Sequence, residues 1–424
     1  MVSLNYERMS TVFVQVGQCG NQVGKEFYRT VSKLQEQRPI FADGDGKWRC
    51  IHVDSEAKVV KSLYFANKKC LRESNIVSGK YGRGTNWAIG YHEDSILSHT
   101  LEVLRREVER CDSYCGTVMI HSLGGGTGSG QGSRLCENIK DEYPMAYILS
   151  AVVAPHISGE SPLQNYNTIL SLGWLQRFSD AVDLFKNDEI LHLTMGANAA
   201  NKTRNSQQTS LADMNCYISD CIAGMCLPLK TNLKKNEKSY LSTDNGICTG
   251  NELWEMLRSV CPMPAYKFLH TACVCKSKSS WEATAESVVN QLTRYNKQGN
   301  ASVSLANLAV VRGDTSSFPY SFKSVEDKLK AGYNCVRWNP FPVDLWTGQE
   351  NMIGCTECSL TVCANTSSFV EYAQCILTKA KVMYHSKAYL HWYQQWGCDE
   401  SNFVESFDIM ENVIEAYTSA ASRR

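Results

Sequence analysis

The residues with the clearest chemical potential form a glycine run at positions 124–130, with the sequence Gly-Gly-Gly-Thr-Gly-Ser-Gly. Residues 117–123 before it are apolar and predict a buried strand, and a segment of helical character follows it. Five glycines in seven residues let successive backbone N–H groups turn toward an anion, and the positive end of the following helix adds attraction. The hydroxyls of Thr127 and Ser129 add donors. The run predicts phosphate binding; the alternative, a flexible turn, leaves the entropic cost of ordering five glycines unexplained.

Two other segments have the same character. Residues 17–24, the first loop, follow a predicted strand and open a helix, and residues 82–87, the third loop, are similarly rich in Gly and Asn. The glycine run lacks the Gly-Lys-Ser/Thr of a Walker A loop and does not fit the G-x-G-x-x-G register, which argues against an NAD-dependent oxidoreductase. Together the three segments predict a nucleotide cradle.

Short apolar runs alternate with helical periodicity between residues 10 and 190. The predicted strands are residues 11–16, 51–53, 117–123 and 146–154, and residues 95–110 have the pattern of an amphipathic helix. Uninterrupted apolar strands that alternate with helices indicate a parallel α/β sheet, which binds ligands at the carboxyl ends of its strands. Residues 265–377 are strand-rich with interspersed helices, and residues 369–419 predict two helical segments divided at Gly397-Cys398-Asp399.

The composition is that of a globular protein. The 424 residues include 43 Lys+Arg and 43 Asp+Glu, so the formal net charge of zero argues against nucleic acid or an anionic membrane surface as the partner. Nineteen cysteines without a recognisable secretory signal predict reduced thiols in the cytosol or nucleus, and the longest apolar stretch is too short to span a bilayer. Cys355, Cys358 and Cys363 make an incomplete zinc ligand set, and residues 234–238 predict a solvated surface loop.

The glycine run is the signature of the tubulin family, which the chain resembles over essentially its whole length. Residues 17–24 look like the first nucleotide loop of that family, and residues 390–403 are similar to its C-terminal helix–turn–helix. Within the family the chain resembles the delta-tubulin subfamily most. That likeness is carried by residues 84–91, 107–113, 164–170 and 386–391.

The resemblance implies an α/β fold with three parts and a guanine nucleotide as ligand. The expected parts are a GTP-binding parallel-sheet nucleotide domain (1–190), a core helix with a mixed α/β intermediate domain (191–368) and a C-terminal helical hairpin (369–424). The implied cofactors are GTP or GDP with Mg²⁺. The residues that match phosphate-side positions of the family are Gln18, Cys19, Gln22, Gly84, Thr85, Asn86, Ser122, Gly124, Gly125, Gly126, Thr127, Gly128, Ser129 and Gly130.

The other implied contacts concern the metal, the ribose and the base. Asp54 and Glu56 match an acidic loop near the γ-phosphate, with Glu56 toward Mg²⁺; without the resemblance a solvated turn would be the simpler interpretation. Glu160 matches a ribose contact, and Asp188 and Asn215 match residues that read the base. Asp188 replaces an Asn, and a carboxylate can accept from both guanine N1–H and the exocyclic amine. Three further departures bear on affinity: Leu211 for an aromatic residue, Thr85 for Asn and Gln164 for Glu.

The delta-tubulin resemblance implies a structural or assembly component of centrioles and basal bodies, needed for triplet microtubules and cilium formation. Other tubulins are the expected partners, without nucleic acid or membrane insertion. The expected locations are the cytoplasm, cytoskeleton, centrosome, centriole and cilium basal body, with the nucleus left open. The alternatives are a general microtubule lattice GTPase subunit or a nucleotide-dependent regulator that does not polymerise.

Hydrolysis of GTP is expected only at a contact between subunits. Glu255 lies seven residues before Pro262, which matches the family's catalytic Glu before its Pro-x-Pro turn; that Glu acts on the nucleotide of the neighbouring subunit. The surrounding residues depart from the family, with Gly250 for Asn and Glu252 for Asp, so an exposed helical Glu is the alternative. The sequence has no acidic run after Glu415, so tail polyglutamylation is not expected.

Overall fold

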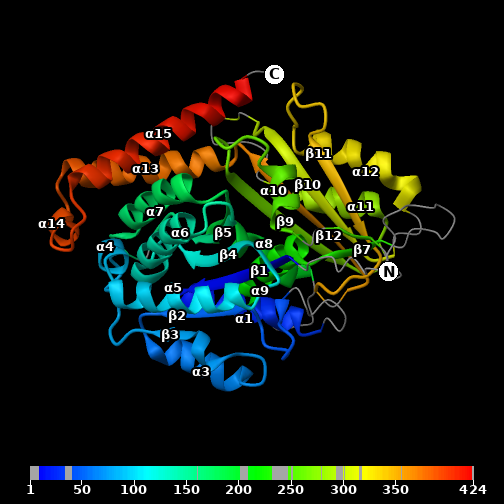
Figure 1. Ribbon diagram of the computed structural model, residues 1–424. Helices are drawn as coiled ribbons and strands as arrows, with labels where there is room; N and C mark the ends of the chain where they lie inside the picture. The colour runs from blue at the N-terminus through cyan, green and yellow to red at the C-terminus, as the bar shows by residue number, and fades with distance from the viewer. Residues whose placement is uncertain are drawn as a thin grey trace. The chain divides into compact units, whose positions relative to one another are not determined.

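The computed structural model describes residues 9–33, 41–159, 161–200, 209–231, 247–249, 252–277, 279–292, 299, 301–314, 318–354 and 356–422 (Figure 1). The chain divides into two compact units. The first comprises Met1–Asp188 with Cys375–Asn412, and the second comprises Glu189–Gln374 with Val413–Arg424. The three-part division at residues 190 and 368 stays a prediction. Within the described residues, no helix combines the length and the apolar character needed to cross a membrane.

The first unit is built on parallel strands. Their order is β6-β5-β4-β1-β2-β3, and each neighbouring pair is parallel. The strands are β1 (Met9–Val16), β2 (Cys50–Asp54), β3 (Ile76–Ser78), β4 (Ser113–Ser122), β5 (Tyr147–Ala154) and β6 (Ala181–Lys186). All five residues of β2 and all but the first of β5 are buried. Strands buried on both faces need continuous apolar runs, and the parallel α/β sheet expected from those runs is confirmed.

Helices alternate with these strands along the chain. They are α1 (Gly17–Val31), α3 (Ala57–Asn67), α4 (Trp87–Tyr91), α5 (Asp94–Glu109), α6 (Gly132–Glu142) and α7 (Gln164–Phe178), with a 3₁₀ turn η1 (Glu73–Asn75) and a π-helical turn η2 (Thr127–Gln131). Helix α5 buries Leu97, Val103 and Leu104 on one face, as its periodicity predicts. Because β4 is followed by η2 and α6, the glycine run lies between a strand end and a helix start.

The C-terminal segment contains one helix more than the sequence predicts. Helices α13 (Phe369–His385) and α15 (Glu400–Ser422) are separated by the short α14 (Leu390–Gln394). The expected break at Gly397 is present, with φ +79° there, but a second break precedes α14. Lys387 and Tyr389 adopt left-handed φ values of 53° and 60° at that break. Neither residue type favours this conformation, so the sequence carries no turn signal there.

The second unit contains a mixed sheet, a separate β-hairpin and several helices. Its strands are β9 (Phe268–Lys276), β10 (Ser304–Arg312), β11 (Val343–Gly348) and β12 (Cys358–Thr366), in the order β11-β10-β12-β9. Strand β10 pairs in parallel with β11 and antiparallel with β12, which pairs antiparallel with β9. A separate antiparallel hairpin joins β7 (Leu229–Thr231) to β8 (Ile247–Thr249). The other elements are α8 (Asn187–Ala200), which begins in the first unit, α9 (Leu211–Cys226), α10 (Leu253–Val260), α11 (Trp281–Asn290) and α12 (Phe318–Gly332).

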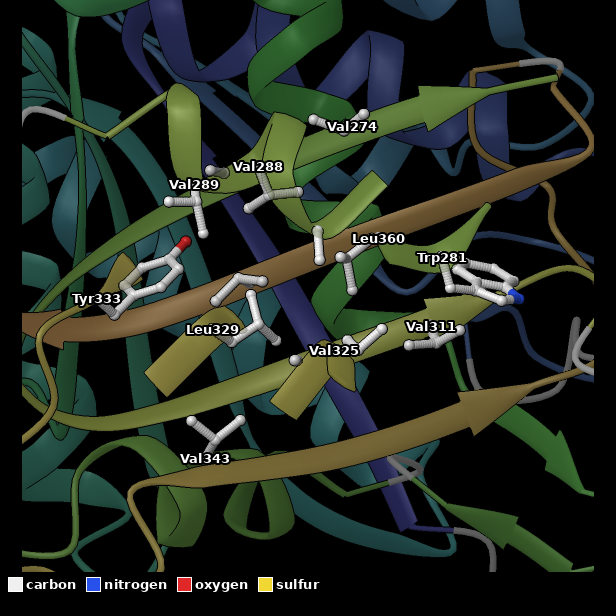
Figure 2. Packing of buried hydrophobic residues seen from close by; sticks show 14 of the residues in the cluster. Val274, Trp281, Val288, Val289, Val311, Val325, Leu329, Tyr333, Val343 and Leu360 are labelled. Atoms are coloured by element: carbon white, nitrogen blue, oxygen red, sulfur yellow. The ribbon is translucent and has the colours of Figure 1, made fainter. Parts of the chain in front are cut away.

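One core cluster joins two helices of the second unit to its sheet. Val288 of α11 and Leu329 of α12 pack with Leu360 of β12 and Val311 of β10, as Figure 2 shows. All four side chains are less than 2% exposed. Burial of closely packed apolar side chains such as these stabilises the layer of helices on the sheet. The mixed α/β character predicted for this part of the chain is confirmed.

Candidate phosphate-binding site

Two helix starts meet beside the carboxyl ends of strands β1 and β4. Helix α1 begins at Gly17, directly after β1, and η2 begins at Thr127, shortly after β4. Gly17 has φ +74°, and a Cβ added there would lie 3.1 Å from the backbone N of Gly128. Neither helix start has a side-chain cap. Helix N-termini without caps present free N–H groups and a positive dipole end, so their convergence is suited to an anion.

The first residues of the glycine run supply the open donors. Within the part of the chain that the structure describes, the backbone N–H groups of Gly124, Gly125 and Gly126 donate to no acceptor. At Gly125 the nearest atom to an added Cβ would be Ser122 Oγ, at 3.5 Å, so the space on that side is open. Gly126 is buried and Gly124 and Gly125 are half-buried, and buried N–H groups are almost always paired in proteins. Three successive unpaired donors beside an open space therefore fit a phosphate group.

The other glycines of the run have a different reason to be there. A Cβ at Gly126 would lie 2.9 Å from Arg83 O and from Asn86 N, and one at Gly128 would lie 2.5 Å from Ser122 Oγ. A Cβ at Gly130 would collide with Trp87 O. None of the glycines in the run has positive φ. The run is packed against β4 and α4, which does not favour the flexible-turn alternative, and close backbone approach rather than unusual φ requires most of its glycines.

The hydroxyls of the run make hydrogen bonds inside the protein. Thr127 Oγ1 lies 2.6 Å from Ser55 Oγ, which ties the glycine run to the acidic loop that follows β2. Ser129 Oγ donates to Gly125 O. The assignment of both hydroxyls to phosphate stays a prediction, and in this structure their contribution is to fix the shape of the run.

The acidic loop offers oxygen ligands beside these donors. Asp54 Oδ1 accepts the Glu56 N–H at 3.1 Å, while Asp54 Oδ2 is buried and has no hydrogen-bond partner among the described residues. Burial raises the pKa of the Asp54 carboxyl above its usual 3.8. The Glu56 side chain is exposed and borders the third loop, because a Cβ at Gly82 would lie 2.8 Å from Glu56 Oε1. Carboxylate oxygens in this arrangement suit Mg²⁺.

Asn21, which the sequence interpretation did not single out, fastens the first loop. Its Nδ2 donates to Gly17 O at 2.9 Å and to Val53 O at 3.0 Å. Its Oδ1 therefore faces His52 Nδ1, 2.8 Å away, which must carry the proton. Burial lowers the pKa of His52 to about 3, so the ring is neutral. The amide holds the start of α1 against the end of β2. The sequence signal that could have identified Asn21 is its position inside the first loop.

The residues predicted within the first turns of α1 have differing exposure. Gln18 is exposed, and Cys19 and Gln22 are half-buried. Enclosure by the surrounding chain raises the pKa of the Cys19 thiol to about 12, so it carries no charge that would repel a phosphate. Their roles at the phosphates stay predictions.

The backbone of the third loop is left-handed at two successive residues, and the loop ends at the N-cap of helix α4. Gly84 and Thr85 have φ values of 53° and 54°. Asn86 caps α4 through its Oδ1, which accepts the Ala88 N–H at 2.8 Å, and its Nδ2 donates to Trp392 O at 3.3 Å. The side chain of Asn86 is thus used to shape the loop. Left-handed Thr85 costs energy, and such outliers concentrate at functional sites.

The residues predicted to bind ribose and base fall into both units. Asp188, at the start of α8, accepts from His156 Nδ1 at 2.6 Å and from the Ile157 N–H at 2.9 Å. Asn215 lies half-buried on α9 in the second unit, and Leu211 at the start of that helix is 70% exposed. Gln164 is buried and donates to His156 O at 2.8 Å. Glu160 lies outside the described residues.

Glu255 lies in the first turn of α10, in the second unit, and is half-buried. Burial and the charge of Glu255 raise the pKa of Glu252, so the two carboxylates are neighbours. Cys355, Gly250 and residues 234–238 lie outside the described residues. Among those that are described, no group of three or more His, Cys, Asp or Glu side chains could hold a metal by itself. Phosphate oxygens would have to complete any Mg²⁺ site here.

Comparisons with known proteins agree with this geometry. Residues 10–195 match the family model "Tubulin/FtsZ family, GTPase domain". The chain is 27% identical to the tubulin delta chain of Homo sapiens over 96% of its own length and 99% of that relative, and 28% identical to the tubulin delta chain of Mus musculus over 97% and 99%. It is 26% identical to a tubulin beta-2 chain of Emericella nidulans over 96% and 93%. The matched domain contains the glycine run, the acidic loop and the first and third loops.

Proposed function

Because this chain belongs to the tubulin family, with a Tubulin/FtsZ GTPase domain in residues 10–195, we propose that it is a guanine-nucleotide-binding cytoskeletal subunit that works in centrioles and basal bodies. The observation that carries the nucleotide part is the meeting of two uncapped helix starts with three unpaired backbone donors at Gly124, Gly125 and Gly126. Successive N–H groups at a helix start bind phosphate through directed hydrogen bonds and the helix dipole.

Different groups of the chain are proposed to bind different parts of the nucleotide. The N–H groups of the glycine run and of the start of α1 hold the phosphates, and Asn21 fixes the start of α1 against the end of β2. Asp188 and Asn215 are proposed to read the base, with Glu160 at the ribose. Asp188 already accepts from two protein donors, and a carboxylate has lone pairs left for the guanine N1–H and amine.

Mg²⁺ is proposed to accompany the nucleotide beside Asp54 and Glu56. Asp54 Oδ2 is a buried acceptor without a partner in the described part of the chain, and a cation nearby would relieve that cost. When bound, the ion would neutralise phosphate charge. The chain's part is to present the two carboxylates at the end of β2.

Similarity to tubulin delta chains over nearly the whole length supports the proposed place of work at centrioles and basal bodies, in support of triplet microtubules and cilium formation. The protein is proposed to act there with other tubulins. The test is to tag the full chain in ciliated cells and measure its distribution at native abundance. Enrichment at centrioles and basal bodies is expected. An even distribution along cytoplasmic microtubules would contradict it and would favour a general lattice subunit, and a diffuse distribution would favour a regulator that does not polymerise.

A further inference from the structure

A buried amide lies at the centre of the first unit's loop network. Asn167 of α7 is fully buried, and both of its polar atoms have two partners. Its Nδ2 donates to Thr85 O at 2.7 Å and to Gly124 O at 2.8 Å. Its Oδ1 accepts the Trp87 N–H at 2.9 Å. A single side chain therefore joins the third loop, the start of α4 and the glycine run.

The second partner of Asn167 Oδ1 comes from the C-terminal part of the unit. The hydroxyl of Tyr393, in α14, donates to Asn167 Oδ1 at 2.6 Å. Tyr393 is fully buried and packs edge-to-face against Tyr166 and Phe403. A second bond, from Asn86 Nδ2 to Trp392 O, joins the third loop to the same short helix. Figure 1 shows α14 and α4 in the same part of the unit, and residues of the two helices are in contact.

This arrangement makes α14 sensitive to the position of the loops. The amide of Asn167 is planar and all four of its hydrogen bonds are made, so a shift of Gly124 O or Thr85 O moves the acceptor that Tyr393 uses. Fully satisfied buried networks are rigid and respond as units. Helix α14 has only five residues and follows a left-handed Tyr389, and the Tyr166 hydroxyl donates to Ala388 O just before it. A change in its two links to the loops changes its stability.

We propose that Asn167 is a positioning residue for the nucleotide loops and that the Tyr393 hydroxyl couples nucleotide binding at the glycine run to the stability of α14. The inference rests on the proposed function, because it takes the glycine run as the phosphate site. A nucleotide that orders Gly124 and the third loop stabilises both links to α14. By linkage, whatever stabilises α14 tightens nucleotide binding by the same factor.

The test is hydrogen exchange followed by mass spectrometry on the full chain, with and without GTP. Two peptide regions are followed, one covering residues 124–130 and one covering residues 386–399. In the unaltered protein GTP is expected to slow exchange in both regions. In Tyr393→Phe, which removes one hydroxyl from a buried ring, slowing is expected to persist at 124–130 and to be clearly reduced at 386–399, where only the Asn86–Trp392 bond remains.

The control variant is Tyr384→Phe, which removes a hydroxyl from the same aromatic group without touching Asn167. Tyr384 of α13 packs against Phe403 and Phe407, and its hydroxyl bonds to Glu400. It is expected to behave like the unaltered protein. Calorimetry should show GTP affinity about fivefold weaker in Tyr393→Phe, the effect of one ordinary hydrogen bond. In Tyr384→Phe the change should be less than about twofold.

The outcomes separate this inference from the proposed function. If GTP slows exchange at 124–130 but not at 386–399 in the unaltered protein, the coupling is wrong and the nucleotide site stands. If both variants respond to GTP as the unaltered protein does, the Tyr393 hydroxyl has no role. If no GTP binding is measured at all, the proposed function itself fails and the inference falls with it.

Discussion

At the residue scale, the glycines of the run at 124–130 serve two different purposes. Gly126, Gly128 and Gly130 leave no room for a Cβ because neighbouring backbone or side-chain atoms occupy that space. Gly125 has room on the protein side, and its N–H has no acceptor among the described residues. Sequence reasoning placed the run between a strand and a helix, as the structure has it, but attributed the glycines to backbone freedom. Contacts across the chain, such as that between Gly126 and Arg83 O, cannot be read from spacing.

Substitution is expected to have a different effect at each of the two kinds of glycine. Gly125→Ala is expected to keep stability within about 0.5 kcal/mol, because its Cβ meets nothing closer than 3.5 Å, yet to weaken GTP binding tenfold or more by filling the phosphate space. Gly126→Ala is expected to destabilise the fold by ~1–3 kcal/mol through its contacts with Arg83 O and Asn86 N. Chemical denaturation and calorimetry on both variants measure the difference. Unchanged GTP affinity in folded Gly125→Ala would reject the assignment.

Asp54 gives a prediction that depends on pH. Burial raises its pKa in the folded chain above 3.8, so the folded state binds the proton more tightly than the unfolded state does. Stability without nucleotide therefore falls as pH rises from 3.8 through the folded-state pKa. Asp54→Asn is expected to remove this loss and to make the nucleotide-free chain more stable at neutral pH, while weakening the Mg²⁺ dependence of GTP binding. Denaturation across pH and calorimetry with and without Mg²⁺ are the measurements; identical pH profiles would count against it.

At the element scale, elements with a strong apolar pattern could be predicted from the sequence, and elements with a weak or interrupted pattern could not. Long apolar runs predicted β1, β2, β4 and β5 to within a few residues. Strand β6 escaped notice because buried Asp183 interrupts its apolar run, and β3 has only three residues. Helix α14 was missed because its preceding break uses residues that rarely adopt left-handed φ. Side chains that join elements, such as Asn167, are invisible to periodicity because their partners lie far away in sequence.

The link between α1 and β2 predicts acid sensitivity. His52 is neutral in the folded chain, with its pKa lowered from 6.5 to about 3 by burial, and its Nδ1–H donates to Asn21. The stabilisation that the neutral His52 ring contributes to the folded chain is fully present above pH 6.5. As pH falls toward 3 it is lost, by up to ~1.4 kcal/mol of unfolding free energy per pH unit. His52→Asn keeps an N–H donor and cannot titrate, so its stability should fall less steeply with acid. Parallel loss in both proteins would exclude His52 as the cause.

At the scale of the whole molecule, the predicted catalytic residue and the phosphate loops belong to different units. Glu255 lies on α10 of the second unit, and the glycine run lies in the first. A Glu that orients water on the nucleotide of a neighbouring subunit would leave an isolated chain unable to hydrolyse GTP. The resemblance to the family, through the position of Glu255 before Pro262, supplied this assignment, because the residues that complete such a site would come from another chain.

Hydrolysis is therefore expected only in assemblies. Glu255→Gln should reduce the GTP turnover of assembled protein by ~100-fold or more while leaving GTP affinity unchanged. Glu286→Gln, the same change at an exposed position of α11, should have no effect. Phosphate release is measured on isolated and assembled protein. Undiminished turnover by isolated chains that carry Glu255→Gln would overturn the role.

The central claim is that the converging starts of α1 and η2 hold a guanine nucleotide. The most direct measurement is to purify the full chain under native conditions, unfold it, and identify and count the released nucleotides by chromatography and mass spectrometry. The account predicts GTP or GDP at close to one per chain, with a clear loss in Gly125→Ala. Release of nicotinamide or adenine nucleotides instead, or of guanine nucleotide in equal amount from Gly125→Ala, would contradict it.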